Sequence, residues 1–438
     1  CDDELARHGL PLADTVYLTG RCLFPSLPDA HMHLSHFALS LTQVDAEPTT
    51  LREALERVAE SAKRTPIGEW VLGRGWNHNV WGSQFPTAAH LDRVAPDRPV
   101  YLGAKSGHAA WVNSLALARA GISAETPDPL GGEVVRDEDG RPTGVLLEGA
   151  MGLVRRLVPE PTANSLLPAM REAIDAANRL GLTMLHDMDG APAFGAEQLL
   201  RERGELNIRI LKSIPLERLD AAIALGLRTG LGDDWLRIGQ VKMFADGALG
   251  PRTAWMLQGY EGDPQDMGIR TTPIQILREA VRKANSAGLG CAIHAIGDRA
   301  CREVLDIYEQ VAALNGEASG RRRSLRNRLE HSQILHPDDV ARFSRLGVIA
   351  SMQPIHCTSD MYISDRHLGA RAPRAYVFRS LLESGAKLAF GSDCPVETID
   401  PLTGLHAAVT RRRADGSPGP GGWHPEQRLT VEQARGRN

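Results

Sequence analysis

The sequence contains no two cysteines at C-x-x-C spacing, no stretch of 18 apolar residues and no basic-then-apolar leader. Its six cysteines are scattered over 438 residues, which argues against a disulfide scaffold and a thiolate zinc knuckle and favours a reducing cytoplasm. Without a long apolar run or a leader, neither a membrane span nor a secretion signal is predicted.

A net basic charge is also absent, since the formal net charge is -4. Nucleic-acid binders usually carry a basic domain or stripe, so we expect no nucleic-acid partner. The short basic runs at 321–323 and 411–413 are expected on the surface or in loops. Aromatic residues make up only 5% of the chain and gather between 70 and 111, as an apolar wall for a substrate or as core packing.

From residue 165 onward, predicted helices alternate with strands that are apolar nearly throughout. This order is typical of a parallel sheet buried on both faces. With the strand at 29–34 there are eight such units, and we expect a closed α/β barrel of the (β/α)8 TIM type rather than an open doubly wound sheet. The predicted helices span 165–179, 197–203, 216–225, 274–287, 301–314, 337–346 and 377–383, and the strands 182–186, 208–211, 240–244, 290–294, 327–331, 347–352 and 387–393.

Residues 25–405 are expected to form this barrel with inserted loops, which hold a helix over 49–63, strands over 70–76 and 99–103 and a hairpin over 132–147. Residues 1–24 are interpreted as the remnant of an N-terminal segment, with a helix over 2–8 and a strand over 15–18. Residues 406–438 are interpreted as the start of a C-terminal return segment. The missing initial methionine and the end just after a helix-like start at 429–432 predict that both termini are incomplete.

His31 and His33 form an H-x-H pair after the turn-prone run 24–28. Side chains two residues apart on a strand point to the same face, so both imidazoles could reach one cation. Alone the pair is a weak indication, because 15 histidines in 438 residues often place two at this spacing by chance. It gains weight because four further strands end in a possible ligand.

The candidate ligands lie at or beside the C-terminal ends of predicted strands, where a barrel keeps its chemistry: His31, His33, Lys242, His294, His331 and Asp393. Histidine and carboxylate suit a divalent ion, with zinc expected first and Mn, Fe or Co as alternatives. A lysine ammonium cannot bind a cation, but N6-carboxylation of Lys242 would give a carbamate that bridges two. The alternative for Lys242 is an ion pair with Asp246 or Asp393, so one or two ions remain open.

This order of ligands resembles the amidohydrolase superfamily, and the flanking sequence is similar to its YtcJ-like branch, amidohydrolase family 3, which includes the N-substituted formamide deformylases. The matching stretches are PDAHMHL (28–34), GWNHNVWG (75–82), DRPVYL (97–102), GHAAWVNS (107–114), VKMFADGALGPRTA (241–254), HAIGDRA (294–300), RLEHSQ (328–333), MQPIHCTSDM (352–361) and GSDCPVE (391–397). The resemblance implies a metal-dependent hydrolase barrel with a small β-sandwich built from both termini. It implies five metal ligands and a carboxylated bridging Lys242: His31, His33, His294, His331 and Asp393.

The expected mechanism follows from these ligands. A divalent ion lowers the pKa of bound water from about 15.7 toward roughly 7 and supplies hydroxide at neutral pH. Asp393 would act as general base and then return the proton to the leaving nitrogen. The metal and a neutral donor, His294 or His331, would stabilise the oxyanion.

Residues in loops that should open on the rim are expected to bind the substrate: His78, Trp81, His108, Trp111, Arg252 and His356. Each could equally belong to the surface or the core, and Arg252 could clamp a substrate carboxylate or pair with Asp246. Glu148 and His186 are weaker candidates for the site. Glu330 should point away from the ligands and is interpreted as structural.

The favoured function is hydrolysis of a small-molecule amide at a non-peptide C–N bond: N-formyl, N-acyl or cyclic. Deamination or ester hydrolysis on the same metal centre is the alternative within enzymes. A barrel that only binds a ligand is disfavoured because all six candidate ligands are present. The sequence also leaves a homodimer open.

Overall fold

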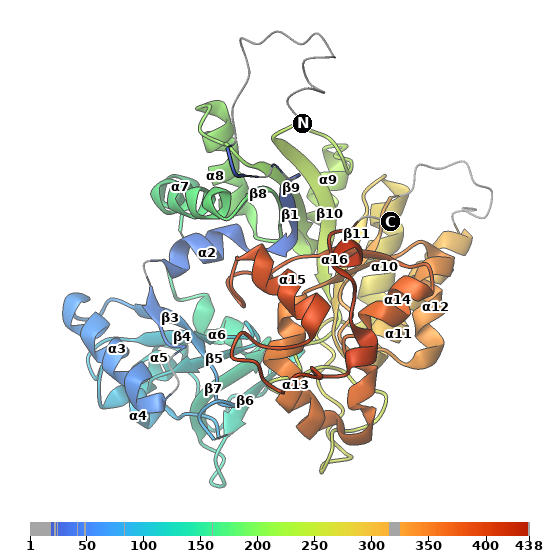
Figure 1. Cartoon of the computed structure of the whole chain (residues 1–438). Coiled ribbons are helices and arrows are strands. Elements are labelled where there is room, and N and C mark those ends of the chain that lie inside the picture. Colours follow the sequence, from blue (N-terminus) through green and yellow to red (C-terminus); the bar gives the residue numbers. More distant parts are fainter. Residues whose placement is uncertain are drawn as a thin grey trace, which may run out of the picture.

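The computed structural model describes residues 19–21, 23, 25–41, 43–47, 50–82, 84–159, 161–314 and 325–436, and two sheets organise it (Figure 1). The larger sheet has eight strands, and each neighbouring pair is parallel. All eight strands predicted from the sequence are confirmed. In sheet order they are β1 (Leu27–Met32), β8 (Leu182–Asp187), β9 (Arg209–Pro215), β10 (Leu236–Phe244), β11 (Cys291–Ala295), β12 (Arg328–His331), β13 (Ile349–Met352) and β14 (Lys387–Phe390).

The first and last strands of this sheet meet, which makes it a nearly closed barrel. The backbone N–H of Asp393, just after β14, donates to the carbonyl of His31 at 2.7 Å, and the N–H of His33 donates to the carbonyl of Cys394 at 2.8 Å. Gly391 permits this approach, because a Cβ there would lie 2.5 Å from the backbone nitrogen of His31. The C-terminal ends of all eight strands therefore share one rim.

Helices follow the strands and cover the outside of the barrel. In α7, Thr162 caps the first turn by accepting from the N–H of Ser165, and Leu166, Met170 and Ile174 place one buried stripe against the strands. The predicted helix over 165–179 is thus confirmed with an earlier start. The helices around the barrel are α2 (Leu34–Ser40), α7 (Ala163–Arg179), α8 (Ala191–Glu202), α9 (Leu219–Ala224), α10 (Ile274–Ser286), α11 (Asp298–Leu314), α12 (Pro337–Leu346), α13 (Pro354–Leu368), α14 (Phe378–Glu383), α15 (Pro401–Thr410) and α16 (Val431–Ala434).

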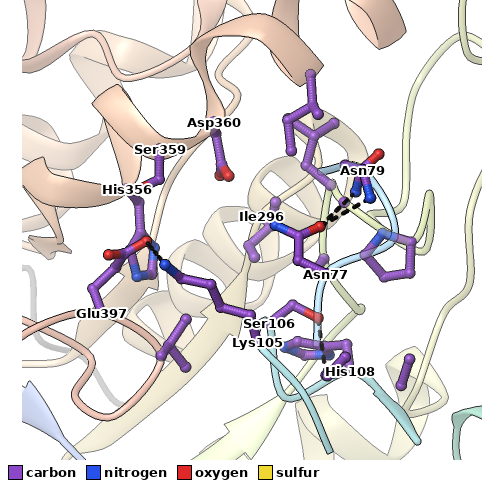
Figure 2. Close-up of a pocket in the computed structure, with 18 of the residues that line it drawn as sticks. Asn77, Asn79, Lys105, Ser106, His108, Ile296, His356, Ser359, Asp360 and Glu397 are labelled. Carbon is purple, nitrogen blue, oxygen red and sulfur yellow. Dashed lines mark hydrogen bonds and ion pairs between the residues drawn. The ribbon is translucent and has the colours of Figure 1, made fainter. Parts of the chain in front are cut away.

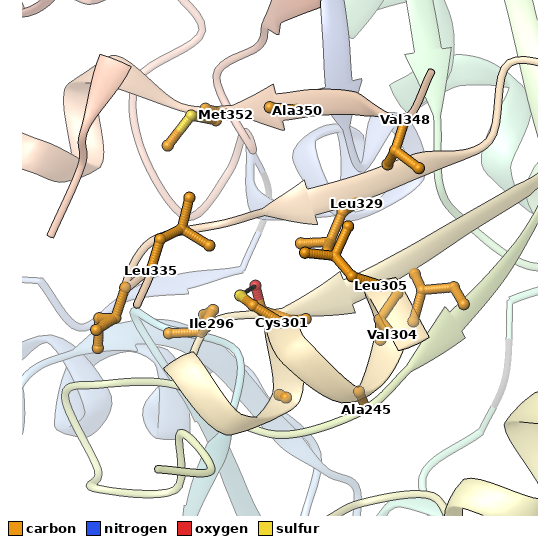
Figure 3. Close-up of a cluster of buried hydrophobic side chains, with 14 of the residues drawn as sticks. Ala245, Ile296, Cys301, Val304, Leu305, Leu329, Leu335, Val348, Ala350 and Met352 are labelled. Atoms are coloured by element: carbon orange, nitrogen blue, oxygen red, sulfur yellow. Dashed lines mark hydrogen bonds between the residues drawn. The ribbon is translucent and has the colours of Figure 1, made fainter. Parts of the chain in front are cut away.

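The main core lies between these helices and the strands. Figure 3 shows Cys301, Val304 and Leu305 of α11 beside Leu329 of β12 and Ala350 of β13, all of them buried. Small and branched side chains fill this layer, and the Cys301 thiol donates to the carbonyl of Ala295 at 3.4 Å. The packing fixes the strands whose ends carry the candidate ligands.

A second sheet is inserted between α2 and α7, where the sequence indicated a helix, strands and a hairpin but no separate sheet. It lies beside the barrel, in the blue-to-teal part of Figure 1. Its order is β2 (Val44–Asp45), β3 (Val71–Trp76), β4 (Val100–Ala104), β5 (Ala109–Val112), β7 (Pro142–Glu148) and β6 (Gly132–Arg136), parallel from β2 to β4 and antiparallel beyond. The accompanying helices are α3 (Leu51–Arg64), α4 (Ala88–Asp92), α5 (Ser114–Ala120) and α6 (Met151–Arg155).

The predicted helix over 2–8, the predicted strand over 15–18 and the basic run 321–323 lie outside the described residues. The described part of 406–436 consists of helices and turns, so the β-sandwich expected from the two termini stays a prediction. None of the described helices combines the length and the apolar character that a bilayer-spanning segment needs.

Candidate active site at the barrel rim

The H-x-H pair and the last candidate ligand converge at the rim. His31 lies on β1, His33 is the residue before α2, and Asp393 follows β14. Asp393 Oδ1 lies 3.4 Å from His31 Nε2 and 3.5 Å from His33 Nε2. For ligand bonds of about 2.0–2.1 Å, two corners of a tetrahedron around zinc lie about 3.4 Å apart. The spacing of these atoms therefore fits one shared cation.

Both imidazoles of the H-x-H pair turn Nε2 toward this point. His31 Nδ1–H donates to Glu330 at 2.6 Å, and His33 Nδ1–H donates to Asp189 at 2.8 Å. A carboxylate can only accept, so the proton of each neutral ring sits on Nδ1 and Nε2 is left with a lone pair. Metal-binding histidines typically have such a partner on the outer nitrogen.

The two histidines from β11 and β12 are held in the same manner. His331 Nδ1–H donates to the side-chain carbonyl of Gln353 at 2.8 Å, and His294 Nε2–H donates to the backbone carbonyl of Gly247 at 2.9 Å. Their ring centroids are 4.5 Å apart. The only N–H of each neutral ring is therefore engaged, whereas we expected one of these rings to donate to an oxyanion.

The pKa values of the three histidines and of Asp393 are consistent with metal-binding imidazoles beside an anionic carboxylate. Burial lowers the pKa of His31 to about 4 and holds the pKa of His331 well below its usual range, so both are neutral at pH 7. Burial also lowers the pKa of His33, but Asp189 and Asp393 raise it to about 9, so this ring carries both protons at pH 7 and would lose the one on Nε2 on binding a metal ion. Burial raises the pKa of Asp393, but the neighbouring histidines lower it further, to well below its usual range.

Lys242 lies on β10, buried beneath the histidines. Its Nζ is 3.4 Å from His31 Nε2 and 4.9 Å from the ring centroid of Phe244. Burial lowers its pKa to about 8, against the raising effect of Glu330 and other carboxylates. Neither of the predicted ion pairs of Lys242 forms among the described residues, because Asp246 instead accepts backbone N–H groups, including that of Gly297 at 2.8 Å.

A cavity of about 760 Å³ opens above these groups, and the inserted sheet supplies one wall of it (Figure 2). Three of the predicted substrate-binding residues line it, His78, His108 and His356. Lys105, directly after β4 of the inserted sheet, pairs with Glu397 on the barrel side at 3.3 Å, as Figure 2 shows. The cavity is thus shared between the two sheets.

The other three predicted substrate-binding residues do not line this cavity. Trp111 is fully buried and its Nε1–H donates to the carbonyl of Thr87, while Trp81 packs against it with ring centroids 6.1 Å apart. Arg252 pairs with Asp263 and with a second aspartate, Asp266, at 3.0 and 2.5 Å rather than with Asp246. These side chains stabilise the walls.

Glu148 and His186 have partners that the sequence did not reveal. Glu148 accepts from His108 Nδ1–H at 2.9 Å and so orients that ring in the cavity wall. His186 lies 2.5 Å from the guanidinium of Arg328, and it does not line the cavity above the rim. Glu330 also binds this guanidinium, at 2.7 Å. The expectation that Glu330 points away from the ligands is wrong, because its other oxygen accepts from His31.

Sequence reasoning missed the acceptors that orient the histidines. Asp189 accepts from His33, from the backbone N–H of Ser35 at 2.7 Å and from the Ser35 hydroxyl at 2.6 Å. It lies two residues after β8, so a carboxylate directly beyond a barrel strand was the available indication. Gln353 similarly follows β13 directly.

Residues 14–435 match the model of the amidohydrolase family. The protein LONG AFTER FAR-RED 3 of Arabidopsis thaliana is 35% identical, with 90% of this chain and 70% of that one covered. The putative amidohydrolase YtcJ of Bacillus subtilis is 33% identical (94% and 78% covered), and the N-substituted formamide deformylase of Arthrobacter pascens is 28% identical (99% and 81% covered).

Among solved structures, an uncharacterized metal-dependent hydrolase from Pyrococcus horikoshii superposes with a TM-score of 0.73 at 29% identity, over 94% of this chain and 78% of that one. The family match extends over nearly the whole chain, and the resemblance inferred from the sequence motifs is confirmed. The chain therefore belongs to the amidohydrolase family, in its YtcJ-like branch.

Proposed function

We propose that this protein is a metal-dependent hydrolase of carbon–nitrogen bonds outside peptides, with N-formyl, N-acyl or cyclic amides as substrates. One observation carries the proposal: the Nε2 atoms of His31 and His33 converge on Asp393 Oδ1, a buried oxygen without a hydrogen-bond partner among the described residues. Such an oxygen is costly unless a cation satisfies it. The deformylase and the metal-dependent hydrolase among the relatives support the same chemistry.

The proposed ligands of a first ion are His31, His33 and Asp393 through Oδ1. A second ion would be held by His294, His331 and Lys242 if the latter is N6-carboxylated. We expect zinc, with Mn, Fe or Co as alternatives, because nitrogen and carboxylate oxygen are the ligands these ions share. When bound, the ion lowers the pKa of a water molecule toward neutrality and polarises the substrate carbonyl.

Asp393 moves the proton. Its Oδ2, which faces away from His31 and His33, takes a proton as the water attacks the carbonyl and returns it to the leaving nitrogen. Its low pKa keeps it anionic before the reaction. His294 and His331 orient and hold rather than donate, because their N–H groups are engaged.

The test is a screen of N-formyl and N-acyl amines with the full chain after chelation and after zinc is restored. We expect activity only in the presence of zinc, and about one or two ions per chain by elemental analysis. Asp393→Asn should abolish turnover, while Asp415→Asn, an exposed aspartate that contacts Ser417, should not change it. Full activity of the metal-free protein would refute the proposal.

The two-ion form has its own test, an experimental electron-density map at Lys242. A carbamate on Nζ is expected if the second ion is present. An unmodified ammonium in a metal-loaded, active protein would leave a single ion as the functional centre.

A further inference from the structure

The two oxygens of Asp393 face two different groups of histidines. Oδ1 faces His31 and His33, as described above. Oδ2 lies 3.7 Å from His356 Nε2 and 4.0 Å from His331 Nδ1. One ligand atom from each of His331, His356 and Asp393 can be chosen so that all three lie within 4.8 Å of one another. This second group does not include the H-x-H pair.

His356 lies in the first turn of α13, with only 6% of its surface exposed. Its Nε2 is buried and has no hydrogen-bond partner among the described residues. The His356 ring is parallel to that of His331, with an interplanar angle of 6° and centroids 6.2 Å apart. Figure 2 shows it in the cavity wall. A buried nitrogen aimed at a carboxylate oxygen, without a partner of its own, indicates that a ligand belongs there.

His356, like His331, has the side-chain amide of a glutamine next to its Nδ1 atom. The Gln333 amide lies 3.2 Å from His356 Nδ1, and its Oε1 is buried without a partner among the described residues. A half-turn of this amide exchanges its two ends, which electron density rarely distinguishes, and brings Oε1 to Nδ1 as an acceptor. Gln353 already accepts from His331 in this way. With Nδ1–H donated to Gln333, His356 Nε2 carries a lone pair toward Asp393.

We infer that His331, His356 and Asp393 Oδ2 form a further cation position, and that its occupation inhibits the enzyme. The inference rests on the proposed function, in which Oδ2 of Asp393 carries the proton. A divalent ion on Oδ2 occupies the lone pair that must accept this proton. It also binds His331 through Nδ1, the nitrogen that faces Oδ2, in place of the hydrogen bond to Gln353. The ring proton then moves to Nε2, so His331 is lost to the proposed two-ion centre. Zinc in excess therefore stops proton transfer without displacing the ion at His31 and His33.

The test uses zinc itself as the probe. The full chain is stripped by a chelator and titrated with Zn²⁺ while bound metal and amidase activity are both measured. We expect activity to rise with tightly bound zinc and to fall as an additional, weaker equivalent binds. His356→Asn should weaken that additional equivalent at least about tenfold and abolish the inhibition, because one of three protein ligands is lost. His406→Asn, which removes an exposed histidine of α15, should behave as wild type.

Gln333→Met provides a second variant that keeps His356 itself. It removes the partner of Nδ1, so the inhibitory equivalent should weaken by about 10–100-fold while the tight zinc remains. The inference is overturned if His356→Asn binds the additional equivalent as tightly as wild type, or if that equivalent raises activity. If no tight zinc binds and zinc confers no activity, the proposed function fails instead.

Discussion

Replacing Asp189 by asparagine should weaken zinc binding through the proton on His33. If the asparagine carbonyl keeps the two donors of Ser35, its NH2 group faces His33 Nδ1, which must then become an acceptor. The proton of the neutral ring moves to Nε2, the nitrogen that lies 3.5 Å from Asp393 Oδ1. The lone pair offered to the cation is lost unless the amide turns and leaves Ser35 unsatisfied.

The size of the effect follows from these contacts. Loss of a hydrogen-bonding partner behind a metal-binding histidine costs about 10–100-fold in affinity, which is about 1.4–2.7 kcal/mol. Removing the charge from the hydrogen bonds of Asp189 should also lower the free energy of unfolding by about 1.5–3 kcal/mol. The Asp189→Asn variant should therefore show both a weaker zinc affinity and a lower free energy of unfolding.

Zinc affinity is measured by competition with a chromophoric chelator, and stability by urea denaturation of the metal-free protein. Ser35→Ala is the matched control: it removes one hydroxyl donor to Asp189 but leaves the bond to His33. It should cost about 1 kcal/mol of stability with zinc affinity unchanged. Wild-type zinc affinity in a folded Asp189→Asn protein would show that Asp189 does not set the tautomer of His33.

Two further predictions concern stability. Gly247→Ala should destabilise the protein by about 1–3 kcal/mol, because its Cβ would lie 2.0 Å from Glu148 Oε1; Gly250→Ala, where the nearest atom is 3.6 Å away, should be neutral in the same thermal melts. Burial and Arg328 lower the pKa of His186 to about 3, so the folded state resists a proton that the unfolded state binds below about pH 6.5. Stability should fall as pH drops, by about 2 kcal/mol for this group between pH 7 and 5, and equal pH slopes of urea denaturation for wild type and His186→Gln would contradict this.

The eight barrel strands could be predicted because each is a short apolar run, which can be recognised without knowing which strand it pairs with. The inserted sheet could not, because β2 has only two residues and because a sequence pattern does not show which strands pair, such as β2 with β3 and β5 with β7. Helix α13 was also missed. It begins at Pro354 and buries polar side chains such as His356, so it has no clear apolar stripe.

Those residues of the candidate site that lie next to strand ends could be predicted from the sequence. His31 and Asp393 lie next to strand ends, and the barrel brings them together. Asp189 was missed because a carboxylate in a loop is common, and only the fold shows which imidazole it faces. Trp111 was expected at the rim as a loop residue, but the inserted sheet places it on β5, in the core.

The backbone hydrogen bond that joins Asp393 to the carbonyl of His31 connects the two ends of the barrel and two residues of the candidate centre at once. During synthesis, the ribosome releases His31 long before Asp393, with more than three quarters of the chain between them. A nascent chain therefore holds the H-x-H pair for most of translation without the carboxylate that completes it. Hydrolytic competence should arise late and abruptly, when the last strand docks against the first.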